Sequence, residues 1–121
     1  AGNWATGGYA GLMLRLADSP AFAYRFTNAA GQPDVQTCGE KSERMEIVAT
    51  AQGSGARAKI TFRDHSENPR HPTPWFARHS TTAHKGRGYY LVGPSMVFHE
   101  PLKLDPGASA RFRYTLTVER L

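Results

Sequence analysis

An arginine and a histidine stand side by side among prolines in the middle of the chain. Residues 64–79 read Asp-His-Ser-Glu-Asn-Pro-Arg-His-Pro-Thr-Pro-Trp-Phe-Ala-Arg-His. Each proline fixes its own φ and favours an extended conformation in the residue before it, so this segment is stiff and not helical. It can therefore hold Arg70 and His71 in defined directions. A guanidinium suits carboxylates, phosphates or neighbouring hydroxyls, and an imidazole can exchange a proton with a sugar oxygen near neutral pH.

Each of these residues also has a structural interpretation. Arg70 could bind carbonyl groups of its own loop, and His71 could satisfy the polar groups of its own turn. Trp75 could offer an apolar ring face on which a sugar stacks, or it could be a core or interface aromatic. Asp64 is a further candidate ligand-binding residue at the start of the segment.

Five histidines raise the question of a metal site. No two of them stand in a His-x-His or His-x3-His pattern, and zinc needs three or four convergent ligands. His65 and His71 could converge with Asp64, whereas scattered surface histidines explain the same composition. We expect no metal. We also expect no cofactor, because the sequence contains no phosphate-binding loop and no dinucleotide fingerprint.

Length and charge limit the class of protein. The 121 residues predict one domain over 1–121, and a hydrophobic content of 40% is that of a folded protein. Residues 1–50 carry four basic and five acidic side chains, and residues 51–121 carry eleven basic and five acidic ones. The basic residues alternate with apolar ones as on a solvated strand face, so we expect no nucleic-acid partner. No apolar run is long enough for a membrane span.

Alternation of apolar and polar residues is the main structural signal, and no stretch shows a helical period. Strands are expected over residues 9–16, 22–27, 45–50, 58–63, 75–79, 89–92, 95–98 and 110–119. Residues 1–8 are expected to be loosely held, and residues 34–43 are ambiguous. About eight short strands separated by glycine and proline turns predict an all-β antiparallel sandwich or barrel with almost no helix.

Several motifs resemble one known family. The run from Asn68 to Thr73, followed by Trp75 and Phe76, is similar to the PmoA-like family of bacteria. The same family resemblance extends to residues 8–15, 62–64, 100–107 and 111–114. The resemblance implies a large two-sheet sandwich similar to galactose mutarotase, which binds sugars on the concave face of one sheet. It also implies a link with bacterial sugar catabolism.

The resemblance covers nearly the whole chain but only the C-terminal half of a usual family domain. It therefore implies a fragment, a separate complementary chain or a reduced sandwich. Aldose mutarotases pair a histidine acid with a carboxylate base. By that analogy Glu100, which follows His99, could stand at the rim of a site with His71, or it could be an exposed loop residue.

We therefore expect a carbohydrate-recognition or sugar-processing domain for a sugar or sugar acid. Arg70, Trp75 and Asp64 would bind the ligand, and His71 and Glu100 would be the catalytic candidates. The alternative is a non-catalytic assembly subunit, because half of a larger sandwich would leave sheet edges to pair as a homo-oligomer or with a complementary chain. No secretion signal opens the sequence, so the bacterial cytoplasm is expected, or the periplasm or exterior if a signal was removed.

Overall fold

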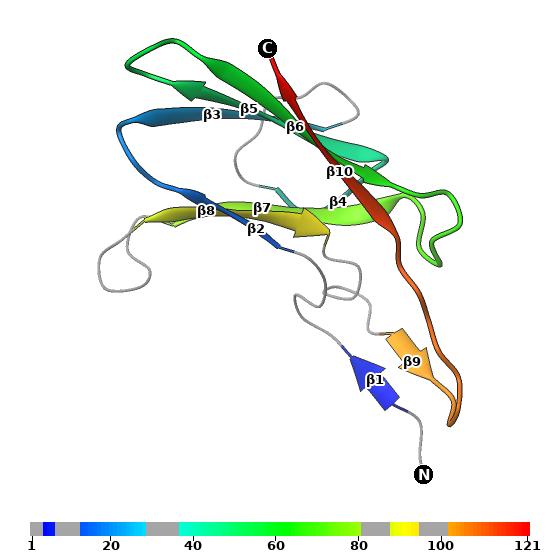
Figure 1. The fold of residues 1–121 in the computed structure, drawn as a ribbon. Helices are drawn as coiled ribbons and strands as arrows, with labels where there is room; N and C mark the ends of the chain where they lie inside the picture. The colour runs from blue at the N-terminus through cyan, green and yellow to red at the C-terminus, as the bar shows by residue number, and fades with distance from the viewer. Residues whose placement is uncertain (1–3, 7–12, 29–36, 81–87, 95–101) are drawn as a thin grey trace.

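The computed structural model describes residues 4–6, 13–28, 37–80, 88–94 and 102–121 (Figure 1). These residues form ten β-strands and no helix. The strands are β1 (Trp4–Thr6), β2 (Leu14–Ala17), β3 (Phe22–Asn28), β4 (Thr37–Ser42), β5 (Arg44–Ala51), β6 (Arg57–Asp64), β7 (Thr73–Ser80), β8 (Tyr89–Pro94), β9 (Leu102–Leu104) and β10 (Tyr114–Arg120). No helix in the described part of the chain is both long and apolar enough to cross a membrane.

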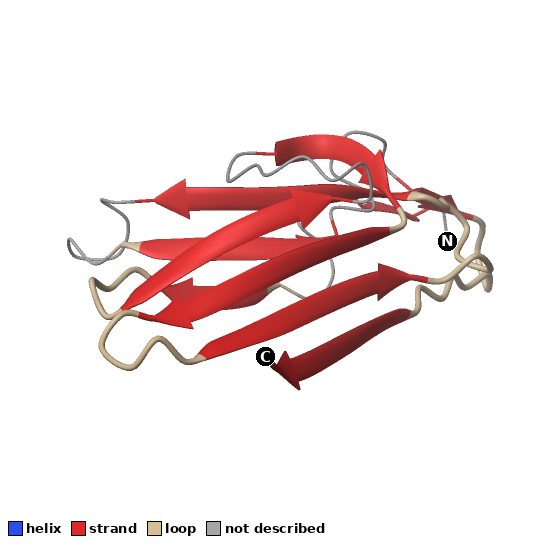
Figure 2. Ribbon diagram, turned by 90° about the horizontal axis from the view of Figure 1, so that it is seen from above, coloured by secondary structure: helices blue, strands red, loops and turns tan. Residues whose placement is uncertain are grey.

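Two antiparallel four-stranded sheets lie over one another as a β-sandwich (Figures 1 and 2). One sheet has the order β10-β6-β5-β3 and the other has the order β2-β8-β7-β4. A separate two-stranded ribbon pairs β1 with β9. The expectation of an all-β antiparallel sandwich is confirmed.

The core lies between the two large sheets. Alternate residues of a strand point to the same face, and here one face of each sheet is apolar. The first sheet contributes Phe26, Met45, Ile47 and Phe62 to the core cluster, and the second contributes Trp75, Ala77 and Val92. Side chains from both sheets therefore form a single hydrophobic core.

The hairpin between β5 and β6 follows the glycine signal in the sequence. Gly55 has a φ of 74°, a value that glycine adopts without steric cost. Backbone hydrogen bonds close the turn from the amide of Ala51 to the carbonyl of Ala56 and from the amide of Gly55 to the carbonyl of Ala51, both of 2.8 Å. This tight turn holds β5 and β6 in one register along seven residue pairs.

Some of the described strands differ from the expectation. β1 lies within the segment expected to be loosely held, and β4 within the segment left ambiguous. β10 begins at Tyr114, four residues after the expected start, because Arg111–Arg113 stands outside the ladder with β6. The strand expected over residues 95–98 lies outside the described residues.

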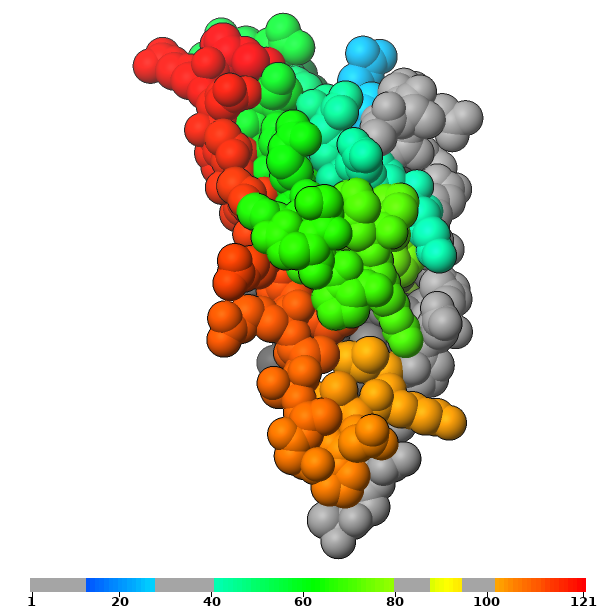
Figure 3. Space-filling view, turned by 90° about the vertical axis from the view of Figure 1, so that its right-hand side faces the viewer, coloured from blue at the N-terminus to red at the C-terminus, as the bar shows by residue number. Residues whose placement is uncertain are grey.

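The loop of residues 65–72 connects the two sheets. It leaves β6 of one sheet after Asp64 and enters β7 of the other sheet at Thr73. The peptide bond between His71 and Pro72 in this loop is cis. The loop stands out on the face of the molecule seen in Figure 3, in green. We refer to residues 65–72 as the β6–β7 loop.

Candidate functional site

The carboxylate of Asp64 organises the β6–β7 loop. Its side chain is fully buried, at 0% exposure. It accepts hydrogen bonds from the backbone amide of Thr73 at 2.8 Å, from the imidazole Nδ1 of His71 at 2.7 Å and from the side-chain amide of Asn68. A buried carboxylate is tolerated only when such donors replace its water, so these three bonds account for an acid in this position.

Asn68 links the loop to the segment that leads into β10. Its side-chain nitrogen also donates to the carbonyl of Arg113 at 2.8 Å, and its side-chain oxygen accepts from the amide of Arg113 at 2.6 Å. The same amide group therefore bonds to Asp64 and to both backbone groups of a residue 45 positions away. Asn68 is buried, and its hydrogen bonds fix one orientation of its side chain.

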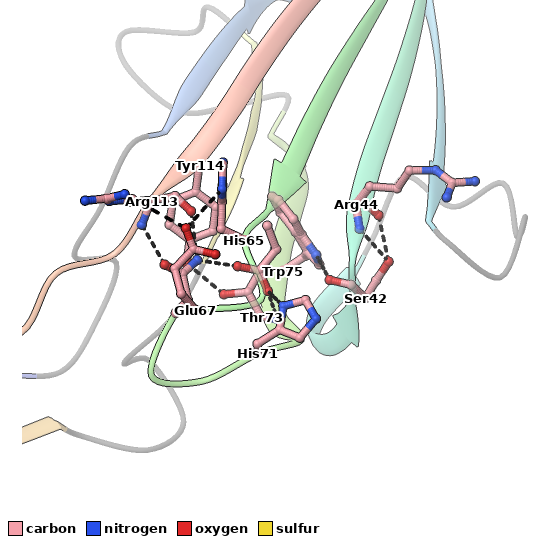
Figure 4. A network of polar contacts seen from close by, with 11 residues as sticks. Ser42, Arg44, His65, Glu67, His71, Thr73, Trp75, Arg113 and Tyr114 are labelled. Carbon is pink, nitrogen blue, oxygen red and sulfur yellow. Dashed lines mark hydrogen bonds and ion pairs between the residues drawn. The ribbon is translucent and has the colours of Figure 1, made fainter.

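A second layer of side chains supports the loop from the core. The hydroxyl of Thr73 shares a hydrogen bond of 2.8 Å with the phenol of Tyr114, and the indole of Trp75 donates to the carbonyl of Ser42 at 2.7 Å (Figure 4). The rings of Trp75 and Tyr114 meet edge to face, with their centroids 6.1 Å apart. Burial of Tyr114 raises the pKa of its phenol to about 12. Thr73, Trp75 and Tyr114 therefore form a packed, hydrogen-bonded layer beneath the loop.

His71 is the member of this network that reaches the surface. Its side chain is 25% exposed, while the carboxylate that holds it is not exposed at all. An ionised carboxylate only accepts hydrogen bonds, so Nδ1 of His71 is the donor to Asp64. The proton on Nδ1 leaves Nε2 as an acceptor in the neutral imidazole, and Nε2 has no hydrogen-bond partner within the described residues. A buried acid that orients a partly exposed imidazole is an arrangement suited to proton exchange with a ligand.

The structure places the predicted site residues in different surroundings. Arg70 lies half-buried beside His71 in the same loop. Asp64 is buried and its oxygens already accept three donors, so it positions His71 and does not contact a ligand directly, contrary to the expectation for this residue. Glu100, the second catalytic candidate, lies outside the described residues, as does His99.

Trp75 does not offer a stacking surface. It is 0% exposed and packs against Phe62, with the ring centroids 5.7 Å apart. A ligand cannot reach either face of a ring buried in this way. The expectation that Trp75 binds a sugar is therefore wrong, and its alternative interpretation as a core aromatic is the one that the structure shows.

The histidines of the loop point to different partners. His65 shares a hydrogen bond of 2.7 Å with the hydroxyl of Thr115, and its other ring nitrogen lies 3.5 Å from the carboxylate of Glu67. His71 instead points to Asp64. No group of three or more His, Cys, Asp or Glu side chains in the described part of the chain could hold a metal ion.

Three members of the network were not recognised from the sequence. Asn68, Thr73 and Tyr114 belong to the motifs that resemble the PmoA-like family, but none of them is a predicted site residue. For Asn68 a local signal exists, because Asn and Asp side chains often hydrogen-bond to nearby backbone in turns. For Tyr114 there is none, because it lies 41 positions from Thr73.

Comparison with known proteins places the chain in a family. No curated protein and no solved structure matches it. A model of the family of unknown function DUF6807 matches residues 3–120, which is nearly the whole chain. The chain therefore belongs to the family of unknown function DUF6807.

Proposed function

We propose that the chain binds a sugar or sugar acid at the β6–β7 loop, with His71 as the central polar contact and Arg70 beside it. One observation carries this proposal. The imidazole of His71 is held by the buried carboxylate of Asp64 through a hydrogen bond of 2.7 Å, while its side chain remains partly exposed. The buried hydrogen bonds of Asp64 and Asn68 hold this surface loop in one conformation. A loop held in this way presents its exposed side chains in fixed directions.

The side-chain chemistry of His71 and Arg70 suits an oxygen-rich ligand. A neutral imidazole that accepts through Nε2 can receive a hydrogen bond from a sugar hydroxyl. The guanidinium of Arg70 offers several donors in one plane, which match a pair of hydroxyls or a carboxylate. The resemblance of residues 68–76 to the PmoA-like family, with its fold similar to galactose mutarotase, supports a sugar as the ligand.

Proton exchange with a bound sugar is the reaction that this site supports best. Nε2 of His71 would take the proton of the anomeric hydroxyl, the bond between the anomeric carbon and the ring oxygen would break, and the ring oxygen would take a proton from water. The hydroxide left by that water would then take the proton from Nε2, which restores the neutral imidazole. Asp64 would stabilise the imidazolium without receiving the proton itself, as the carboxylate does in other acid–histidine pairs. The expected reaction is therefore the opening and closing of a hemiacetal ring.

Titration with sugars tests the proposal. Calorimetry or nuclear magnetic resonance titration with neutral monosaccharides and with uronic acids should show binding to the unmodified chain. His71→Ala and Arg70→Ala should each weaken that binding roughly tenfold or more, since each removes hydrogen bonds to the ligand.

His79→Ala is the matched control. His79 also binds an aspartate, with its Nε2 2.8 Å from Asp18, and its side chain is 26% exposed. It lies at the opposite end of β7 from the β6–β7 loop. Its replacement should leave sugar binding unchanged. Equal losses of affinity in His79→Ala and His71→Ala would place the ligand elsewhere.

A further inference from the structure

The last strand, β10, has an apolar and exposed edge. It is the outer strand of its sheet, and within the described strands it pairs only with β6. Leu116 is 42% exposed and Val118 is 66% exposed, so two neighbouring inward positions of this strand are not covered. Exposed apolar side chains beside an unpaired strand edge commonly mark an interaction surface.

The backbone of β10 shows which of its residues offer hydrogen bonds at that edge. The amide of Leu121 donates to the carbonyl of Arg57 at 2.9 Å, so the polar groups of Leu121 point towards β6. In an antiparallel pair these directions alternate along the strand. The backbone groups of Thr115, Thr117 and Glu119 therefore also point towards β6. Those of the even-numbered residues 114, 116, 118 and 120 point to the outer edge.

The exposed apolar side chains and the outward backbone groups thus belong to the same residues, Leu116 and Val118. Edge strands that avoid association usually carry a bulge, a proline or a central charge. β4, an edge strand of the other sheet, has a register shift between Cys38 and Glu40. β10 pairs with β6 without any shift over all seven residues, and its charged residues lie only at its end.

We propose that β10 pairs antiparallel with β10 of a second copy of the chain, which joins the two β10-β6-β5-β3 sheets into one continuous sheet. A two-fold axis through Thr117 places Leu116 opposite Val118 of the second copy. In this register all seven residues of the strand have a partner. The residues with outward backbone groups face one another, which is the requirement for hydrogen bonding across the axis. Four exposed apolar side chains then form one cluster on the inner face.

The charges of the strand fit the same register. Glu119 lies opposite Thr115 of the second copy, and it keeps its ion pair with Lys59 of its own chain, at 3.4 Å. Arg120 lies opposite Tyr114 of the second copy, and no two like charges face each other. The strand is complementary to itself, which favours a second copy over a different partner.

Amide hydrogen exchange and molar mass together test the dimer. The unmodified chain should show the mass of two chains by light scattering. Its amides at Leu116 and Val118 should then exchange as slowly as those at Thr117 and Glu119. Val118→Lys should halve the mass and speed exchange at Leu116 about tenfold or more, while Thr117 stays protected by β6. Protection at Thr117 also shows that the variant is folded.

Gln52→Lys is the control, because it adds the same charge in the exposed turn between β5 and β6. It should remain a dimer. A monomeric unmodified chain with fast exchange at Leu116 and Val118 would overturn the proposal. A dimer that persists in Val118→Lys would overturn it as well, because the contact would then lie on another surface.

Discussion

The imidazole of His71 and the carboxylate of Asp64 are joined by a hydrogen bond of 2.7 Å between Nδ1 and Oδ2. The acid is the last residue of β6 and is fully buried, whereas the histidine lies in the loop and is partly exposed. The same carboxylate oxygen accepts the amide of Thr73, the first residue of β7. One buried group therefore fixes both the connection between the two sheets and the direction of the histidine.

Asp64→Asn should destabilise the fold by about 2–4 kcal/mol. If the new amide keeps its oxygen towards His71 and Thr73, its nitrogen faces the side-chain nitrogen of Asn68. Asn68 cannot turn over without reversing its two bonds to the backbone of Arg113. Urea unfolding measures the loss. Asp105→Asn, in the exposed turn after β9, is the control and should cost less than about 0.5 kcal/mol. Equal effects of the two substitutions would contradict the organising role of Asp64.

Tyr114→Phe should make the protein less sensitive to alkali. Burial raises the pKa of the phenol from 10.0 to about 12, so between these values the folded chain keeps a proton that the unfolded chain loses. The free energy of unfolding therefore falls as the pH rises through this window. Burial also raises the pKa of Tyr24 and Tyr90. The free energy of unfolding of Tyr114→Phe should therefore still fall as the pH rises, but by less than that of the unmodified chain.

Urea unfolding at a series of pH values between about 10 and 12 measures this effect. The informative quantity is the difference in the free energy of unfolding between the unmodified chain and Tyr114→Phe at each pH. That difference should shrink or reverse as the pH rises, because only the unmodified chain must retain the proton of Tyr114. Parallel curves across the whole window would contradict the burial of this phenol.

Trp75→Phe should lower stability without weakening sugar binding. The substitution removes the hydrogen bond to the carbonyl of Ser42 and leaves a space in the core, at a cost of about 2–4 kcal/mol. Because the indole is fully buried, no ligand contact is lost. Thermal unfolding and a sugar titration on the same sample separate the two effects. A loss of affinity at unchanged stability would show that Trp75 contacts the ligand after all.

The alternation of apolar and polar residues was enough to predict β5 and β6. β5 and β6 have this pattern, and a glycine-rich turn joins them. The local preferences of this segment therefore agree with the hairpin that it forms in the fold. β4 could not be recognised in the same way, because its sequence Thr-Cys-Gly-Glu-Lys-Ser has little β-propensity and contains the register shift. Its conformation depends on pairing with β7, which lies some thirty residues further along the chain.

The site was predictable only in part for a related reason. The prolines around Arg70 and His71 marked the loop, and the loop does connect two strands of the sandwich. The partner of His71 was named as a ligand-binding residue, because nothing in the sequence shows that Asp64 is buried. The contacts of Asn68 with Arg113 and of Thr73 with Tyr114 join segments more than forty residues apart, and such pairs follow only from the packing of the sheets.

Calorimetric titration of a uronic acid into the unmodified chain and into His71→Ala, at neutral pH, measures whether His71 contributes to sugar binding. We expect saturable binding to one site, a roughly tenfold or greater loss of affinity in His71→Ala, and unchanged affinity in His79→Ala. Near-native thermal unfolding of both variants would show that the difference arises at the site. If no neutral or acidic sugar binds the unmodified chain, or if His71→Ala binds as tightly as the unmodified chain, His71 is not part of a sugar site.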